Sequence, residues 1–87
     1  MKLWILRPQE NLPADDDPWI PWYDKCFGMV IRAKNEETAR ARAHGVSGSE
    51  RHEHENVAPW LEEKYSSCKE LTGRGDEEVI LLDYRIA

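Results

Sequence analysis

The strongest constraint on the fold is the stretch KLWILR at residues 2–7, which is apolar on both faces of the strand it predicts. Side chains of a strand alternate between the two faces of its sheet, so Leu3 and Ile5 share one face and Trp4 lies on the other. A strand of this kind is typical of the middle of a sheet that is covered on both sides. The chain must therefore supply two flanking strands and two covering layers.

A second strand is predicted from CFGMVIRAK at residues 26–34, which has the clearest alternation in the chain. Asn35 is then expected to cap a helix that starts with two glutamates and ends at Gly45. The residues Ala39, Ala43 and Val46 form a thin apolar stripe on this helix, which predicts close packing on the sheet. Its solvated side is expected to carry Arg40 and Arg42.

The third strand is predicted from EEVILLDYRI at residues 77–86, because its apolar residues alternate. The stretch PWLEEKY, residues 59–65, predicts one helical turn beginning at a proline, and SSCKEL predicts a brief strand. A strand–helix–strand crossover favours parallel outer strands, with the first strand between them and antiparallel to both. We therefore predict an α+β fold: one β-β-α-β domain over residues 1–87, with a three-stranded sheet of order 2-1-3. The helix is expected on one face and an aromatic loop on the other.

The aromatic loop contains DDDPWIPWYDKCFG, residues 15–28. Pro18 and Pro21 restrict its backbone to extended geometry, so the loop is a stiff ribbon that carries large side chains. Such aromatic groups either complete a small core or anchor a binding partner. We expect Trp22 to be buried and Trp19 to be more exposed. Candidate partner-binding residues are the aromatic anchors and the acidic residues that would steer a basic partner: Trp19, Trp22, Tyr23, Asp15, Asp16, Asp17 and Glu53.

The charge of the chain narrows the classes of partner. Seventeen acidic and 12 basic residues give a formal net charge of −5. This disfavours direct nucleic-acid binding, which depends on lysine and arginine contacts to phosphates, and it favours a partner with a basic surface. No apolar run reaches membrane length, no signal-peptide pattern opens the chain, and two cysteines are too few for a disulfide framework. We expect a cytoplasmic protein.

Catalytic and cofactor motifs are not evident. Cys26 and Cys68 lack histidine and acidic partners at any informative spacing, and the glycine turns SGSE and GRGD lack the setting of a phosphate loop. We therefore predict neither an enzyme nor a cofactor. The residues His44, His52 and His54 are weak metal candidates, which leaves a small metal- or ligand-binding protein as an alternative.

Three blocks of the chain carry a resemblance: MKLWILRP, DPWIPWYDKCFGMVIRAKNEETARARA and PWLEEKYSSCKEL. Together they are similar to small uncharacterised proteins of phages, prophages and bacteria, a type without assigned chemistry. The resemblance implies a short accessory protein, such as an inhibitor of host defence of the anti-CRISPR kind. The leading hypothesis is thus a non-enzymatic acidic module that binds a larger bacterial protein or complex, for instance as a phage-encoded inhibitor of a defence or nucleic-acid-handling complex. A homodimeric assembly protein is a further alternative.

Overall fold

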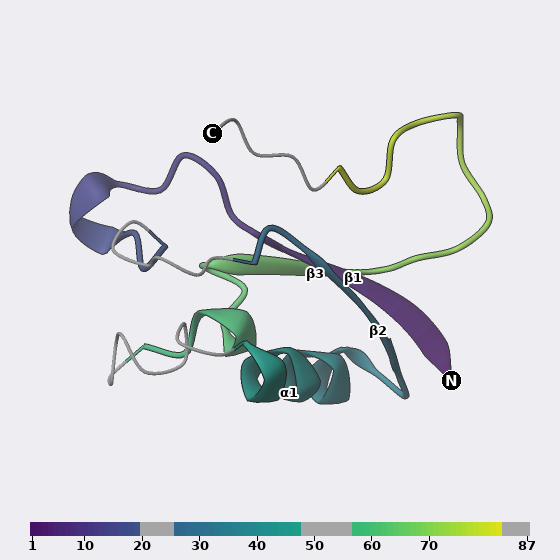
Figure 1. The fold of residues 1–87 in the computed structure, drawn as a ribbon, viewed down its shortest axis with the longest axis horizontal. Coiled ribbons are helices and arrows are strands. Elements are labelled where there is room, and N and C mark those ends of the chain that lie inside the picture. The colour runs from purple at the N-terminus through teal and green to yellow at the C-terminus, as the bar shows by residue number, and fades with distance from the viewer. Residues whose placement is uncertain (20–25, 48–56, 83–87) are drawn as a thin grey trace.

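Strand β1, Lys2–Pro8, is the central strand of a three-stranded sheet in the computed structural model, which describes residues 1–19, 26–47 and 57–82 (Figure 1). Strand β2, Met29–Ala33, and strand β3, Ser66–Glu70, pair antiparallel with its two edges. The order is β2-β1-β3, so the outer strands run parallel to each other. The predicted α+β class and strand order are confirmed, and KLWILR is central because both of its faces need cover.

The third strand is not the predicted segment 77–86. It is formed by SSCKE, which directly follows the short 3-10 helix η3, Pro59–Leu61. Residues 77–82 are exposed and lie outside any strand, and residues 83–86 lie outside the described part of the chain. The segment that pairs with this edge of β1 is the one whose first residue, Ser66, is held by hydrogen bonds from Arg40 and to the Pro59 carbonyl.

Helix α1, Glu36–Val46, begins as predicted at Asn35. The Asn35 side chain accepts a hydrogen bond from the Thr38 amide at 2.9 Å, and the Thr38 hydroxyl accepts one from the Asn35 amide at 3.2 Å. This reciprocal capping box satisfies two backbone donors that the first turn of a helix leaves open. The predicted end at Gly45 is wrong, because the helix continues to Val46 and Ser47 is its C-cap.

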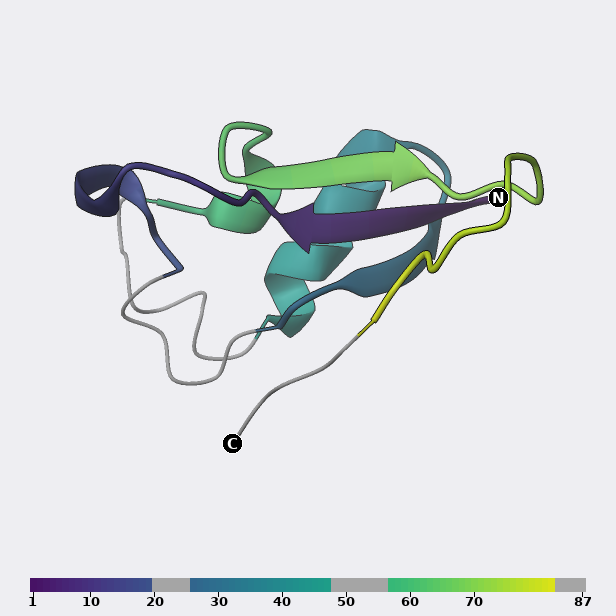
Figure 2. The same ribbon diagram turned by 90° about the horizontal axis from the view of Figure 1, so that it is seen from above.

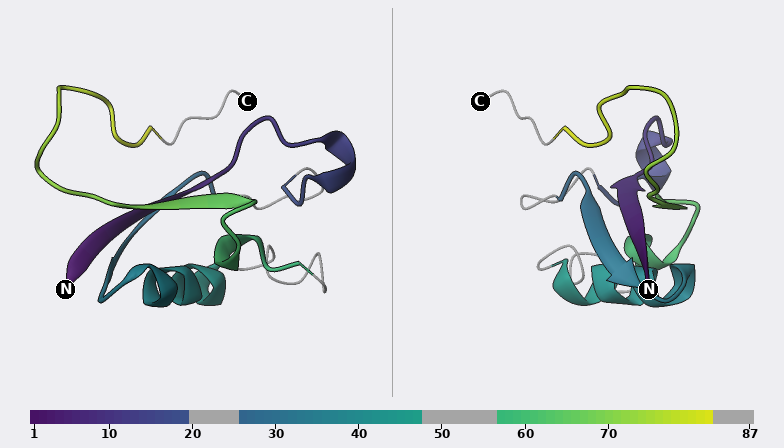
Figure 3. Two further views of the ribbon diagram at one scale, coloured as in Figure 1. Left: turned by 180° about the vertical axis from the view of Figure 1, so that it is seen from behind. Right: turned by 90° about the vertical axis from the view of Figure 1, so that its right-hand side faces the viewer.

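The sheet has different cover on its two sides. Helix α1 packs on one side, and the segment that follows β3 passes over the opposite side (Figures 1 and 3). Seen from above, the three strands lie side by side and this segment runs back toward the start of β2 (Figure 2). We call the side opposite α1 the far face.

The core lies between the sheet and α1. Ala39 and Ala43 of the helix are fully buried, as predicted, whereas Val46 at its end is exposed. Small alanines let the helix approach the sheet and leave volume that large side chains must fill. The buried cluster is made of Leu6, Trp19, Ala33, Ala39, Ala43, Trp60 and Tyr65.

Trp19 fills part of that volume, so its predicted exposure is wrong. The indole is 3% exposed and meets the Trp60 ring edge-on, with centroids 5.0 Å apart. Its Nε1 donates a hydrogen bond to the Tyr65 carbonyl at 3.0 Å. The described end of the aromatic loop therefore closes the core on the helix side, and the far face is crossed by residues after β3 instead. Trp22 and Tyr23 lie outside the described residues.

Candidate functional site

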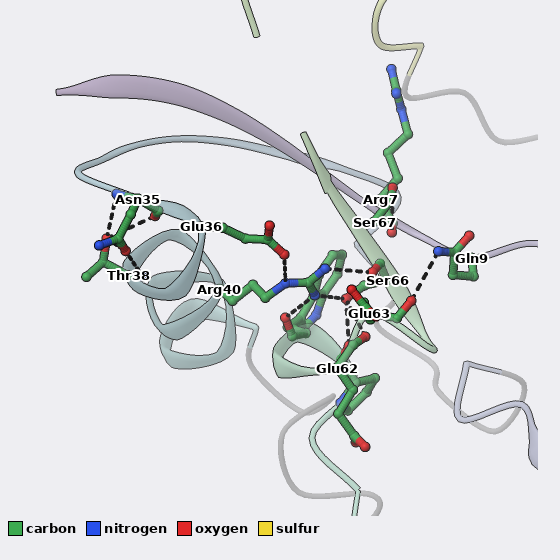
Figure 4. A network of polar contacts seen from close by, with 12 residues as sticks. Arg7, Gln9, Asn35, Glu36, Thr38, Arg40, Glu62, Glu63, Ser66 and Ser67 are labelled. Carbon is green, nitrogen blue, oxygen red and sulfur yellow. Dashed lines mark hydrogen bonds and ion pairs between the residues drawn. The ribbon is translucent and has the colours of Figure 1, made fainter. Parts of the chain in front are cut away.

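Arg40 is buried, which corrects its predicted solvated position. The side chain leaves α1 and reaches the start of β3 (Figure 4), and the residue is only 7% exposed. Its guanidinium donates to the Trp60 carbonyl at 3.1 Å, the Ser66 hydroxyl at 2.8 Å and the Ser66 carbonyl at 3.0 Å. Its Nε also pairs with Glu36 at 2.8 Å. These hydrogen bonds join Arg40 of α1 to the carbonyl of Trp60 in η3 and to Ser66 at the start of β3, so Arg40 holds the three elements together.

Two of the three aspartates proposed to steer a partner are held by the fold. Asp16, at the end of the 3-10 helix η1 (Ala14–Asp16), accepts a hydrogen bond from the Tyr65 hydroxyl and pairs with Lys64 Nζ, each at 2.5 Å. These hydrogen bonds, first from Lys64 and then from Tyr65, lower the pKa of the Asp16 carboxyl. Asp17 accepts a hydrogen bond from the Trp19 amide at 2.9 Å. Both carboxylates thus position the aromatic loop against the core.

The other proposed steering residues are placed differently. Asp15 is exposed and makes no hydrogen bond or ion pair with the residues that the structure describes. Glu53 lies outside the described residues. The predicted cluster of aromatic anchors beside acidic residues is therefore not brought together as one exposed surface in the described part of the chain.

The far face of the sheet carries a mixture of apolar and basic side chains. Because Trp4 and Leu6 face the core, the alternate residues of β1 face the other way. Their cross-strand partners share that face: Val30 and Lys69 lie opposite Ile5, and Arg32 lies opposite Leu3. The far face is thus built from Leu3, Ile5, Arg7, Val30, Arg32 and Lys69. It carries three basic groups in a chain whose net charge is −5.

Residues 76–82 cross this far face, and we call them the C-terminal ribbon. The ribbon has the sequence DEEVILL, three carboxylates followed by four consecutive apolar residues. Val79 and Leu82 are 76% and 71% exposed. Within the described residues, no hydrogen bond or ion pair attaches the ribbon to the sheet. Apolar contact is what holds it in place.

Leu81 makes the closest of these contacts. A Cβ built on Gly28 would lie 2.5 Å from Leu81 Cδ1, so the leucine occupies space that any side chain at position 28 would need. A groove of about 590 Å³ remains between the sheet and the ribbon. It is lined by apolar, basic and acidic groups that include Ile5, Arg7, Lys69, Glu78, Val79 and Ile80. The ribbon therefore covers the far face only in part.

Both cysteines are partly buried. Cys26 and Cys68 are not joined in a disulfide, and burial raises the pKa of the Cys68 thiol despite the positive charge of Arg40 nearby. A raised pKa keeps the thiol protonated, whereas a nucleophilic cysteine needs its thiolate.

The histidines proposed as metal ligands are only partly described. His44 lies near the end of α1, and its Nδ1 atom is buried without a hydrogen-bond partner in the described structure. His52 and His54 lie outside the described residues. Among the residues that are described, no group of three or more histidine, cysteine or acidic side chains could hold a metal ion.

Comparison of the chain with protein families, with curated proteins and with solved structures finds no match. In the described part of the chain, no helix has the length and apolar character needed to cross a bilayer. The surface that the sequence interpretation missed is the C-terminal ribbon on the far face. A signal is present, because Val79–Leu82 is a run of four apolar residues rather than a strict alternation, whereas the sequence analysis predicts residues 77–86 as the third strand of the sheet.

Proposed function

We propose that this chain is a non-enzymatic, acidic protein-binding module that binds a basic surface on a larger bacterial protein or complex through its C-terminal ribbon. The observation that carries the proposal is the exposure of four consecutive apolar residues directly after three carboxylates. Exposed contiguous apolar surface marks interaction sites in small proteins, and neighbouring charges of one sign accelerate encounter with an oppositely charged partner. Large aliphatic side chains then supply the buried contact.

The ribbon is a better candidate than the aromatic loop for a physical reason. Trp19 is already buried against Trp60, and Asp16 and Asp17 already accept hydrogen bonds from the chain itself. Using these groups for a partner would first break contacts of the core. Releasing or covering the ribbon breaks no hydrogen bond between described residues.

The more specific proposal is a phage-encoded inhibitor that acts in the bacterial cytoplasm on a defence or nucleic-acid-handling complex. Its support is the resemblance of three sequence blocks to small phage and prophage proteins, together with the net charge of −5. Complexes that handle nucleic acids present basic surfaces, which an acidic module can occupy.

The test is an affinity capture from bacterial lysate with quantitative mass spectrometry and four baits. The wild type is compared with Val79→Asp/Leu82→Asp, which disrupts the apolar end of the ribbon, and with Glu77→Gln/Glu78→Gln, which removes two charges. Val46→Asp is the matched control, since Val46 is also 70% exposed but lies on the helix side. We expect one partner to be captured by the wild type and by Val46→Asp and to be lost with the apolar double variant. With the charge variant, capture of the same partner should depend less on the salt concentration. Equal capture by all four baits would contradict the proposal.

A metal- or ligand-binding role for His44, His52 and His54 is the second candidate. One observation favours it: the buried Nδ1 atom of His44 has no hydrogen-bond partner in the described structure. Histidine nitrogens in this condition are available as ligands for zinc. A rise in the melting temperature on adding zinc, lost with His44→Ala, is expected if this candidate is correct, and the absence of any zinc effect would remove it.

A further inference from the structure

We propose that the far face of the sheet binds the C-terminal ribbon of a second copy of this chain, so that two copies exchange ribbons and form a twofold dimer. This inference goes beyond the proposed function, because it concerns self-association rather than the larger partner. It rests on the seat of Leu81, on the attachment of the ribbon and on charge complementarity.

The seat of Leu81 shows that the far face accepts this particular segment. Gly28 leaves a hollow beside β2, and Leu81 Cδ1 lies in it, 2.5 Å from where a Cβ on residue 28 would be. A ribbon from a second copy has the same sequence, so it can place its own Leu81 in the same hollow. Exchange of identical elements recreates the contacts of the single chain and is therefore an inexpensive route to a dimer.

The connection between β3 and the ribbon can open at little cost. It contains Gly73 and Gly75, and a Cβ built on either glycine would have no heavy atom within 4 Å. Gly75 has a φ of 119°, which is accessible chiefly to glycine, so the turn depends on a local conformation rather than on packing. Beyond the bond from the Arg74 amide to the Thr72 hydroxyl, no hydrogen bond between described residues holds this turn.

Charge makes the two surfaces complementary. The ribbon carries Asp76, Glu77 and Glu78, and the far face carries Arg7, Arg32 and Lys69. Each copy presents both surfaces, so two identical contacts form at once and the assembly closes after two chains. Apposition of the two far faces also covers apolar side chains that one chain leaves open, among them Leu3, Val30 and Val79. This additional burial is what an exchanged dimer gains over two separate chains.

A cross-linking experiment distinguishes a ribbon on its own sheet from an exchanged one. The variant Gly28→Cys/Leu81→Cys, in a Cys26→Ser/Cys68→Ser background, is oxidised at about 100 µM, where a dimer with a Kd near 10 µM is largely formed. The control variant is Gly28→Cys/Val46→Cys in the same background, because Val46 lies near the helix end and not on the ribbon. We expect a covalent dimer on a non-reducing gel for the first variant and not for the control. A monomer with an internal disulfide, or equal dimer in both variants, would overturn the inference.

Self-association of the unmodified chain gives a second readout by native mass spectrometry. We expect Val30→Asp to weaken the dimer by about tenfold or more, because Val30 is 44% exposed in one chain and is covered only when two far faces meet, and Val46→Asp to leave it unchanged. A chain that is monomeric at every concentration, or a dimer that Val30→Asp leaves intact, would refute the exchange. Circular dichroism verifies that each variant folds, and the cross-link decides the question if Val30→Asp is unfolded. Capture of a larger partner by a strictly monomeric chain would leave the proposed function standing and remove only this inference.

Discussion

Replacing Arg40 with alanine is expected to be among the most destabilising changes on α1. The Gln9 amide donates to the Tyr65 carbonyl, so the next pair along the ladder, Pro8 and Ser66, directs its backbone polar groups away from the partner strand. The Ser66 carbonyl therefore depends on Arg40, which bonds it at 3.0 Å, and the Trp60 carbonyl accepts from the same guanidinium at 3.1 Å.

The magnitude follows from what the variant leaves behind. Arg40→Ala removes the donor from two carbonyl oxygens in a buried setting, and each unsatisfied acceptor costs about 1–3 kcal/mol. The Ser66 hydroxyl keeps its bond to the Pro59 carbonyl at 2.7 Å, and Glu36 is half exposed, so neither adds a large term. We expect a loss of about 2–5 kcal/mol in the free energy of unfolding. That is a large part of the roughly 4–13 kcal/mol typical of a domain of this length.

Urea unfolding followed by tryptophan fluorescence measures this loss, because Trp19 and Trp60 are buried together next to the network. Arg42→Ala is the matched control: the same substitution on the same helix at an exposed position, with an expected change within about 0.5 kcal/mol. Similar midpoints for the two variants would refute the argument that Arg40 ties the helix to the sheet edge. A loss below about 1 kcal/mol would show that water replaces the guanidinium at both carbonyls.

Three further outcomes follow from other contacts of the fold. The pKa of the Asp16 carboxyl is lowered in the folded chain, so the carboxylate stabilises the fold at pH values above its unfolded pKa of about 3.9. This stabilisation is lost as the pH falls through the folded pKa. In urea melts, the stability advantage of the wild type over Asp16→Asn should therefore shrink below about pH 4. Gly28→Ala and Leu81→Ala should show a coupling energy of about 1 kcal/mol in a double-mutant cycle, because the methyl group added at position 28 collides with the Leu81 side chain only when that side chain is present. Additive effects of the two substitutions on the free energy of unfolding would contradict the contact. Asn11 has a φ of 60°, which glycine adopts more easily than alanine. In thermal melts, Asn11→Ala should therefore lower the free energy of unfolding by about 1 kcal/mol, whereas Asn11→Gly should change it little. Equal melting temperatures of the two variants would count against this backbone effect.

The arrangement of the fold was largely predictable from local patterns. KLWILR indicated a central strand, the alternation after Cys26 indicated its neighbour, and Asn35 marked the start of the helix, all of which the structure confirms. These features depend on side-chain periodicity and capping chemistry within a few residues, which a sequence displays directly. The α+β class and the strand order then follow from the topology of short connections.

The errors concern side chains whose partners are distant in the sequence. Arg40 looks like a solvated residue of a charged helix face, and only its contacts with Trp60 and Ser66, 20 and 26 positions away, show that it is buried. Trp19 follows three aspartates and a proline, which favours exposure. In the structure, however, the Trp19 amide donates a hydrogen bond to the Asp17 carboxylate, and the Trp19 indole N–H donates one to the Tyr65 carbonyl. Burial of a polar or amphipathic side chain is decided by such partners, and no local pattern encodes them.

The choice of the third strand explains why the candidate site escaped the sequence interpretation. Two segments with strand-like sequences, residues 66–71 and 77–86, compete for one open edge of β1. The first wins because Ser66 is fixed by Arg40 and by the preceding turn, whereas the second has more apolar surface but no comparable polar attachment among the described residues. The apolar residues of the C-terminal ribbon then remain at the surface, where burial in a strand would have made them part of the core. Local sequence preference and global structure disagree most at this segment, and such disagreement is expected where a chain retains surface for binding.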